Sequence, residues 1–174
     1  MYQLNGVMYS AEEIKAKVVE LAKQIEKDYA GEELLVVGIL KGASVFCADL
    51  IREIDLDVKM DFMVVSSYGS GTTSSGTVKI IKDLDVDIEN KNVLIVEDII
   101  DSGLTLSSLV EALKTRNPKS LRLCTLLDKP ERRKANIKVD YVGYVIEDKF
   151  IVGYGIDYDE KYRNLPYIGI VEDI

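Results

Sequence analysis

The chain has 174 residues, of which 47% are hydrophobic and 30% charged, the ordinary balance of a globular protein with one sizeable core. Its formal net charge of -8 disfavours nucleic acid or an anionic membrane as the main partner, and no apolar run is long enough to span a membrane. Histidine is absent, which excludes Ser-His or Cys-His catalysis and His-ligated metals, so an oxygen-ligated cation such as Mg²⁺ is the natural metal candidate.

In chain order, the pattern of apolar residues predicts strands alternating with helices. Residues 2–9 are interpreted as a small hairpin that turns at Asn5-Gly6. Ser10 and Glu13 form a capping-box pattern at the start of a helix. The elements that follow are a strand over 34–40, a helix that carries Phe46 and Ile54 inward, strands over 57–67, 78–82 and 93–97, a helix over 104–115, and strands over 121–127, 141–146, 151–154 and 167–171.

This alternation indicates an α/β fold with a largely parallel central sheet. No internal repeat or linker divides the chain, so we expect residues 1–174 to form a single domain. Cys47 and Cys124 lie in apolar contexts without a close-spaced motif, and the N-terminus lacks a signal-peptide pattern. We therefore expect two buried, reduced thiols in a cytoplasmic protein.

The stretch from Val93 to Leu106 carries the most distinctive chemistry. Its apolar run ends in Glu97 and Asp98, Asp101 follows, and residues 102–105 (Ser-Gly-Leu-Thr) lead into a helix. A helix N-terminus with nearby hydroxyls suits a phosphate, and carboxylates suit sugar hydroxyls or a metal ion. Acids near a helix often only complement its dipole, which accounts for Asp101 but not for two acids directly ending a strand.

Adjacent residues on a strand point to opposite faces, and this bears on how the two acids act. We expect the side chains of Glu97 and Asp98 to diverge and to act as separate acceptors rather than share a proton. Three further strand ends carry polar groups, at Lys41-Gly42, Asp128-Lys129 and Asp157. Each alone is more often a solvated loop residue, but several at one sheet edge indicate a ligand site.

Known nucleotide-binding patterns are absent from the chain. No Walker-type loop occurs, and the glycine-rich loop over 68–77 fails the dinucleotide fingerprint because a serine, Ser74, stands at the third glycine position. A phosphate site in this protein must therefore be of another kind.

Five stretches at ordered spacing identify a resemblance. They are Gly38-Ile-Leu-Lys41-Gly42, Ser67-Tyr68-Gly69, Val93 to Leu106, Leu127-Asp-Lys129-Pro, and Phe150-Ile-Val-Gly153-Tyr-Gly-Ile-Asp157-Tyr158 with Arg163 beyond it. The third resembles the phosphoribosyl diphosphate motif of type I phosphoribosyltransferases. The whole set, which runs over nearly the full length, resembles the hypoxanthine(-guanine) phosphoribosyltransferases of that family. The resemblance implies the type I fold, with a small hood region formed by the terminal segments.

For the sugar donor, the resemblance implies that Glu97 and Asp98 hold the ribose hydroxyls, whose oxygens also ligate Mg²⁺. Lys41 and Gly42, through a non-proline cis peptide, and Arg163 are implied to bind the diphosphate. The residues implied to bind the 5′-phosphate, largely through backbone N–H groups, are Ser102, Gly103, Leu104 and Thr105. Because Leu104 stands where some relatives carry lysine, phosphate binding there rests on backbone and hydroxyl groups.

For the purine, the resemblance implies that Asp101 acts at N7 as general acid and base. Lys129 is implied to donate to the 6-oxo group, Phe150 to stack on the base and the Ile151 backbone to read its edge. Asp157 is implied to border the purine site and to ligate a second Mg²⁺. A lid with Ser67 and Tyr68 at its start is implied to close over the reacting centre.

The function that the resemblance implies is a Mg²⁺-dependent purine salvage enzyme, cytoplasmic and a homodimer or homotetramer. It would transfer 5-phosphoribosyl from phosphoribosyl diphosphate to N9 of hypoxanthine, and of guanine, giving IMP or GMP and diphosphate. Two alternatives stay open: a xanthine-preferring phosphoribosyltransferase, and a non-catalytic regulator that keeps the sugar-diphosphate site and binds RNA or DNA. The acidic composition and the presence of Asp101 and Lys129 weigh against the regulator.

Overall fold

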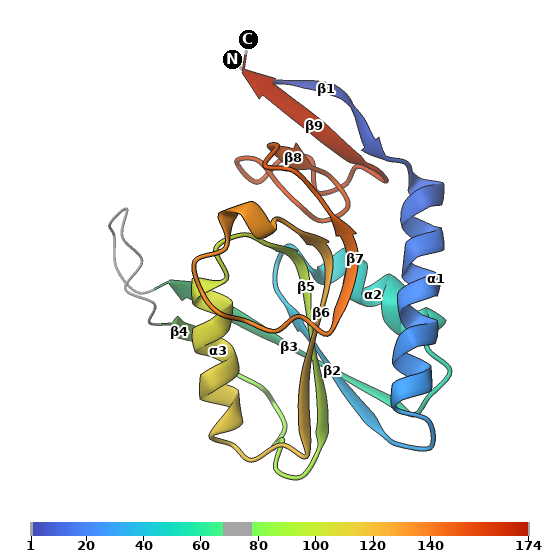
Figure 1. The fold of residues 1–174 in the computed structure, drawn as a ribbon, viewed down its shortest axis with the longest axis vertical. Helices are drawn as coiled ribbons and strands as arrows, with labels where there is room; N and C mark the ends of the chain where they lie inside the picture. The colour runs from blue at the N-terminus through green and yellow to red at the C-terminus, as the bar shows by residue number, and fades with distance from the viewer. Residues whose placement is uncertain (1, 68–77, 174) are drawn as a thin grey trace.

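A six-stranded sheet in the order β4-β3-β2-β5-β6-β7 forms the centre of the computed structural model, which describes residues 2–67 and 78–173 (Figure 1). Its strands are β2 (Leu34–Ile39), β3 (Val58–Ser67), β4 (Val78–Lys82), β5 (Asn92–Ile100), β6 (Ser120–Asp128) and β7 (Tyr141–Val145). All neighbouring strands are parallel except β3 and β4. The expected α/β fold with a largely parallel sheet is therefore confirmed.

Helices cover both faces of this sheet (Figure 1). Helices α1 (Ala11–Asp28) and α2 (Ser44–Glu53) pack on one face, and α3 (Leu104–Lys114) packs on the other. Strand β2 shows why both faces are apolar, since Val36 belongs to the core under α1 and α2 whereas Val37 belongs to the core under α3. A strand buried on both faces is apolar throughout, which is why the sequence pattern located it.

A smaller antiparallel sheet, in the order β1-β9-β8, forms the expected hood. It is made of β1 (Tyr2–Tyr9), β8 (Ile151–Val152) and β9 (Ile168–Asp173). The two chain ends meet in it, at one end of the molecule beyond α1 and β7 (Figure 1). The chain between β8 and β9 reaches the central sheet, because a Cβ at Gly155 would lie 2.4 Å from the carbonyl oxygen of Gly42, just after β2.

The hairpin expected over residues 2–9 is wrong. The segment is the single strand β1, and it pairs with β9 across nearly the whole chain. Gly6 has φ +99°, and the β1–β9 register shifts between Leu4 and Val7. The glycine thus serves a bulge in a strand rather than a turn between two strands. A local pattern could not identify this, because the partner strand lies at the other end of the chain.

Two strand boundaries also differ from expectation. Strand β5 continues past Glu97 to Ile100, so the two adjacent acids lie within the strand rather than at its end. Strand β8 ends at Val152 instead of Tyr154, because Gly153 and Tyr154 both have positive φ, at 104° and 51°. Positive φ values are incompatible with an extended strand.

Two expectations from composition can be compared with the structure. Both Cys47 and Cys124 are buried free thiols, as expected, and burial raises the pKa of Cys47 to about 12. A thiol with so high a pKa is a poor nucleophile. None of the helices in the described part of the chain is long and apolar enough to cross a membrane.

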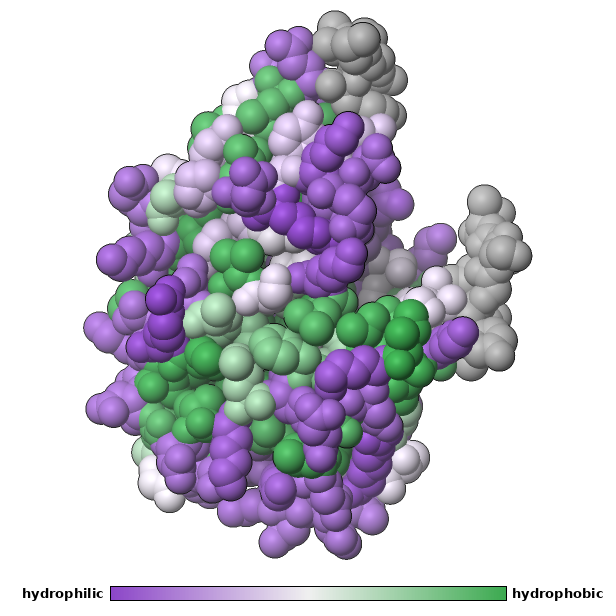
Figure 2. All heavy atoms as spheres, turned by 180° about the vertical axis from the view of Figure 1, so that it is seen from behind, coloured by the Kyte–Doolittle hydropathy of each residue, from purple (hydrophilic) through white to green (hydrophobic). Residues whose placement is uncertain are grey.

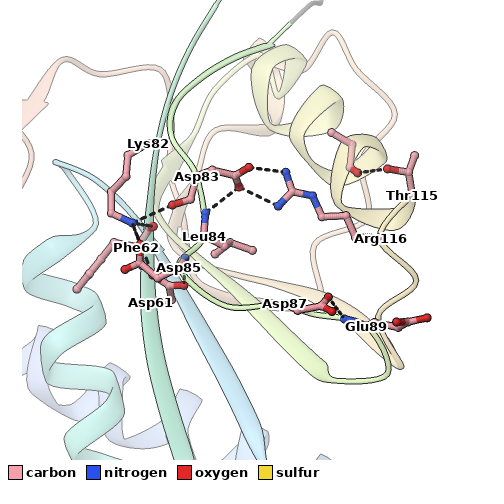
Figure 3. Close-up of polar contacts among 11 residues, drawn as sticks. Asp61, Phe62, Lys82, Asp83, Leu84, Asp85, Asp87, Glu89, Thr115 and Arg116 are labelled. Atoms are coloured by element: carbon pink, nitrogen blue, oxygen red, sulfur yellow. Dashed lines mark hydrogen bonds and ion pairs between the residues drawn. The ribbon is translucent and has the colours of Figure 1, made fainter.

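Polar contacts tie strand β3 and the edge strand β4 to neighbouring segments (Figure 3). Asp61, on β3 and 6% exposed, accepts a 2.8 Å hydrogen bond from the backbone N–H of Asp85, and the Lys82 ammonium lies 3.7 Å from it. Arg116, just beyond α3, donates to both carboxylate oxygens of Asp83 at 2.8 Å. The acidic connection after β4 is therefore held by ion pairs to Lys82 on one side and to Arg116 on the other.

The Asp83–Arg116 pair gives a pH-dependent prediction. The hydrogen bonds from the Arg116 guanidinium lower the pKa of Asp83 in the folded protein. The pair therefore adds to the free energy of unfolding above the pKa that Asp83 has in the unfolded chain, and this stabilisation is lost as the pH falls through the lower pKa of the folded state. We expect Asp83→Asn to lower the free energy of unfolding by about 0.5–1 kcal/mol at pH 7, with the difference narrowing below about pH 4. Urea unfolding at several pH values measures this, with Glu89→Gln in the same connection as control; an equal loss at every pH would contradict it.

Candidate active site

The carboxyl ends of three adjacent parallel strands bring the expected site residues to one edge of the sheet. Lys41 follows β2, Asp98 lies near the end of β5, and Lys129 follows β6. The segment between β8 and β9, with Asp157 and Arg163, reaches the same edge because Gly155 packs on the backbone of Gly42. Ligands of parallel α/β sheets bind at this edge.

The turn between β5 and α3 has the geometry of an anion-binding cradle. Gly103 is the N-cap of α3 with φ +73°, and no side chain caps the helix. The Leu104 N–H has only a 3.4 Å contact to Ser102 Oγ, and the following first-turn N–H groups have no acceptor within the helix. A cavity of about 180 Å³ lies in front of them, and its lining consists of Val65, Glu97, Ile99, Ile100 and residues 101–106. The expected phosphate residues thus share one cavity with Glu97.

Arg133 contacts the turn between β5 and α3. The sequence analysis did not single it out. Its Nε–H donates to the Asp101 carbonyl oxygen at 3.2 Å, and its guanidinium also donates to the Asp128 carboxylate. A Cβ at Gly103 would lie 3.1 Å from Arg133 Cδ, so the side chain packs against the turn. No motif marks Arg133, because its partners lie in earlier segments of the chain.

Glu97 and Asp98 are neighbours within β5 and influence each other electrostatically. Asp98 Oδ1 accepts a hydrogen bond from the Ile99 N–H at 2.7 Å. Burial raises the pKa of both acids, and the charge of Asp98 adds to the rise at Glu97. Glu97 lines the cavity in front of α3, and the expectation that the two acids act as separate acceptors stays a prediction.

Asp98 also rests directly on the turn after β2. A Cβ at Gly42 would lie 1.9 Å from Asp98 Oδ2, and a Cβ at Gly155 would lie 2.4 Å from the Gly42 carbonyl oxygen. The peptide that precedes Gly42, between Leu40 and Lys41, is cis. Gly42 is therefore enclosed by a carboxylate on one side and by backbone on the other.

Charged residues on the facing segment complete this side of the site. The Lys41 ammonium lies 2.9 Å from Glu160 Oε2, and Arg163 NH2 lies 3.2 Å from Glu160 Oε1 and 3.3 Å from Asp157 Oδ1. The Lys41 ammonium lowers the pKa of Glu160. Two cations that the resemblance assigns to diphosphate thus share one carboxylate, which the sequence analysis did not single out.

The expected purine residues lie on the other side of Asp101. Lys129 has a side chain only 8% exposed, and its ammonium donates to the Lys149 carbonyl oxygen at 2.6 Å and lies 3.9 Å from Asp101 Oδ1. The Phe150 ring, 43% exposed, meets Tyr158 edge to face at a centroid distance of 5.2 Å. Ile151 is buried in β8. The structure therefore brings a buried ammonium, a carboxylate and an aromatic segment into one region.

The carboxylates of the site do not form a metal site by themselves. Within residues 2–67 and 78–173, no group of three or more His, Cys, Asp or Glu side chains could hold a metal ion. Asp157, for example, accepts from the Glu160 N–H at 2.8 Å. Mg²⁺ commonly binds one or two carboxylates together with ligand phosphate oxygens, so the oxygen donors fit it without an all-protein cage.

The expected lid falls largely outside the described residues. Ser67 is exposed at the end of β3, whereas Tyr68 lies outside them.

Comparison with known proteins gives consistent matches. A family model described as the phosphoribosyl transferase domain matches residues 8–159. The chain is 56% identical over 171 residues to the hypoxanthine-guanine phosphoribosyltransferase of Bacillus subtilis (strain 168), covering 98% of the chain and 95% of the relative. It is 55% identical over 167 residues to the hypoxanthine phosphoribosyltransferase of Escherichia coli (strain K12), covering 95% and 94%. A crystal structure of a hypoxanthine-guanine phosphoribosyltransferase from Bacillus anthracis matches with a TM-score of 0.94 at 53% identity, covering 99% of this chain and all of that one.

Proposed function

This chain belongs to the phosphoribosyltransferase family, and we infer that it catalyses the hypoxanthine phosphoribosyltransferase reaction of purine salvage. The enzyme transfers the 5-phosphoribosyl group from phosphoribosyl diphosphate to N9 of hypoxanthine, giving IMP and diphosphate. The observation that supports a purine base as the acceptor is the buried Lys129 ammonium, which lies 3.9 Å from Asp101 Oδ1 beside the anion cradle. This arrangement offers a donor for a carbonyl and a carrier for a proton next to a phosphate site.

We propose the following division of the sugar site. The carboxylates of Glu97 and Asp98 hold the ribose hydroxyls, and the turn of residues 102–105 binds the 5′-phosphate through its free N–H groups. Lys41 and Gly42 bind the diphosphate together with Arg163, because these donors lie at the same sheet edge. One Mg²⁺ would be held by the ribose oxygens at Glu97 and Asp98, and a second by Asp157, each with ligand oxygens. Bound there, the ions would supply positive charge that offsets the charge on the departing diphosphate.

The transfer breaks the bond between C1′ and the diphosphate oxygen, and the electron pair leaves with the diphosphate. N9 of the purine forms the new bond to C1′ through an oxocarbenium-like state, and the purine ring loses a proton. We propose that Asp101, placed at N7, takes that proton. Lys129 holds the 6-oxo group, Phe150 stacks on the base, and the Ile151 backbone reads its edge.

Several further features belong to this proposal. We propose that guanine is a second substrate, that residues 1–174 are a single domain, and that Ser67 begins a lid that includes Tyr68. We also propose a cytoplasmic homodimer or homotetramer without a nucleic acid or membrane partner. The face drawn in Figure 2 supports self-association, because apolar side chains gather in a band across its middle. Light scattering after gel filtration measures the assembly.

The proposed function is tested by product analysis. Purified protein is incubated with phosphoribosyl diphosphate, Mg²⁺ and a mixture of hypoxanthine, guanine and xanthine, and nucleotides and diphosphate are quantified. We expect IMP and GMP, each with one diphosphate. Release of no diphosphate with any of the bases would refute the function, and a dominant xanthine product would establish the xanthine-preferring alternative.

Lys129 gives a prediction for base recognition. We expect Lys129→Met to lower kcat/KM for hypoxanthine by about 10- to 150-fold, because a charged hydrogen bond to the 6-oxo group is worth about 1.5–3 kcal/mol. The KM for phosphoribosyl diphosphate should change little. Lys149→Met is the matched control, because Lys149 accepts the hydrogen bond from Lys129 through its backbone carbonyl, which the variant keeps. Equal losses in both variants would contradict the assignment.

A further inference from the structure

Glu160 occupies the place between the two cations assigned to diphosphate. Its Oε2 accepts a 2.9 Å hydrogen bond from the Lys41 ammonium, and its Oε1 accepts a 3.2 Å hydrogen bond from Arg163 NH2. The cations come from separate parts of the fold, since Lys41 follows β2 and Arg163 lies between β8 and β9. One carboxylate therefore connects these two parts of the site through the donors that the diphosphate needs.

The backbone around Glu160 holds this side chain in place. Asp159 and Glu160 are consecutive non-glycine residues with φ of 51° and 61°, in the left-handed region that most side chains avoid. The Glu160 N–H donates to Asp157 Oδ2 at 2.8 Å, and Tyr158 and Lys161 close the turn with two backbone hydrogen bonds. Two consecutive residues with positive φ between paired flanking residues are the geometry of a tight two-residue hairpin turn, which fixes where the Glu160 backbone lies.

The ion pair itself does not account for this arrangement. The side chains of Lys41 and Glu160 are 67% and 65% exposed, and exposed pairs stabilise a fold only weakly. A carboxylate oxygen and a diphosphate oxygen are both anionic acceptors of similar size, so they compete for the same N–H donors. Diphosphate that binds Lys41 and Arg163 must displace Glu160 from them.

We propose that Glu160 is a placeholder carboxylate that occupies Lys41 and Arg163 until diphosphate oxygens displace it. By this competition Glu160 weakens the binding of both the sugar donor and the released diphosphate, and it helps the product to leave by returning to the same donors. The inference rests on the proposed function, because it takes from there that Lys41 and Arg163 bind diphosphate. It adds a residue that sets the affinity for one substrate and one product.

The test compares Glu160→Gln with unchanged protein by calorimetric titration of inorganic diphosphate in the presence of Mg²⁺. We expect diphosphate to bind Glu160→Gln about 3- to 10-fold more tightly, the size expected when exposed ion pairs of about 0.7–1.4 kcal/mol in total no longer compete. The KM for phosphoribosyl diphosphate should fall in parallel, and the KM for hypoxanthine should stay unchanged.

Asp159→Asn is the matched control. It removes one negative charge from the same turn, and among the described residues the Asp159 side chain forms no ion pair with Lys41 or Arg163. Equal tightening in both variants would show a general charge effect and would overturn the inference. Unchanged or weaker binding in Glu160→Gln would also overturn it, the weaker result showing that Glu160 holds the cations or a metal ion for the ligand. Unchanged protein that bound neither diphosphate nor phosphoribosyl diphosphate would instead overturn the proposed function.

Discussion

Asp101→Asn is expected to lower kcat for IMP formation by about 10²- to 10⁴-fold, the usual contribution of a positioned general acid or base. Asparagine keeps the shape of the side chain but cannot accept a proton, and the chain contains no histidine that could replace it. The Asp101 carbonyl oxygen, which accepts from Arg133, is retained in the variant. The turn should therefore keep its geometry, and the dissociation constant of phosphoribosyl diphosphate should stay the same.

Steady-state rates and calorimetric titration measure the two quantities separately. Asp148→Asn is the control, because the Asp148 carboxylate lies 3.5 Å from the Lys129 ammonium, much as Asp101 lies 3.9 Å from it. An equal loss of kcat in both variants would show that the loss comes from the reduced negative charge near Lys129 and not from a proton carried by Asp101. An Asp101→Asn variant with the kcat of unchanged protein would remove the proton-carrier role altogether.

Gly42→Ala is expected to raise the dissociation constant of phosphoribosyl diphosphate by about 10²-fold or more. The new Cβ would lie 1.9 Å from Asp98 Oδ2 and 2.8 Å from its Cγ, so the carboxylate must move. A carboxylate moved away from the ribose hydroxyls loses charge-assisted hydrogen bonds worth about 1.5–3 kcal/mol each, which is about 10- to 150-fold per bond in the dissociation constant. The turn cannot retreat in exchange, because the Gly42 carbonyl is already packed against Gly155.

Overpacking by itself also destabilises a fold by about 1–3 kcal/mol, and a control must separate this from loss of binding. Gly143→Ala serves, because its Cβ would lie 2.4 Å from the Leu126 carbonyl oxygen on β6, away from Asp98. We expect both variants to unfold at lower denaturant concentration and only Gly42→Ala to lose the sugar donor. Normal binding by a folded Gly42→Ala protein would show that the position of Asp98 is not critical.

Features whose physical cause is local could be predicted from the sequence. The capping box of Ser10 and Glu13 is present, because both hydrogen bonds join residues three positions apart. Strand β2 was found because burial on both faces makes its residues apolar, and α3 begins at Leu104 as expected. The chemistry of the turn before α3 was readable for the same reason, since one continuous segment supplies the acids, the glycine and the hydroxyls.

Features that depend on partners far along the chain were not predictable in this way. The hairpin expected at Asn5-Gly6 is a strand of the hood, because its hydrogen-bond partners lie in β9. The roles of Arg133 and Glu160 follow from contacts made across 32 and 119 residues. No spacing rule relates such residues.

The sequence by itself determined the α/β class, the turn before α3 and the groups that we propose for the sugar donor and the base. These depend on the order of apolar and polar residues within single elements. Only the tertiary structure decided that Asp98 rests on Gly42 and that Glu160 lies between Lys41 and Arg163. The reason is that parallel pairing of β2 with β5, and the return of the chain between β8 and β9, set these distances, and both are long-range.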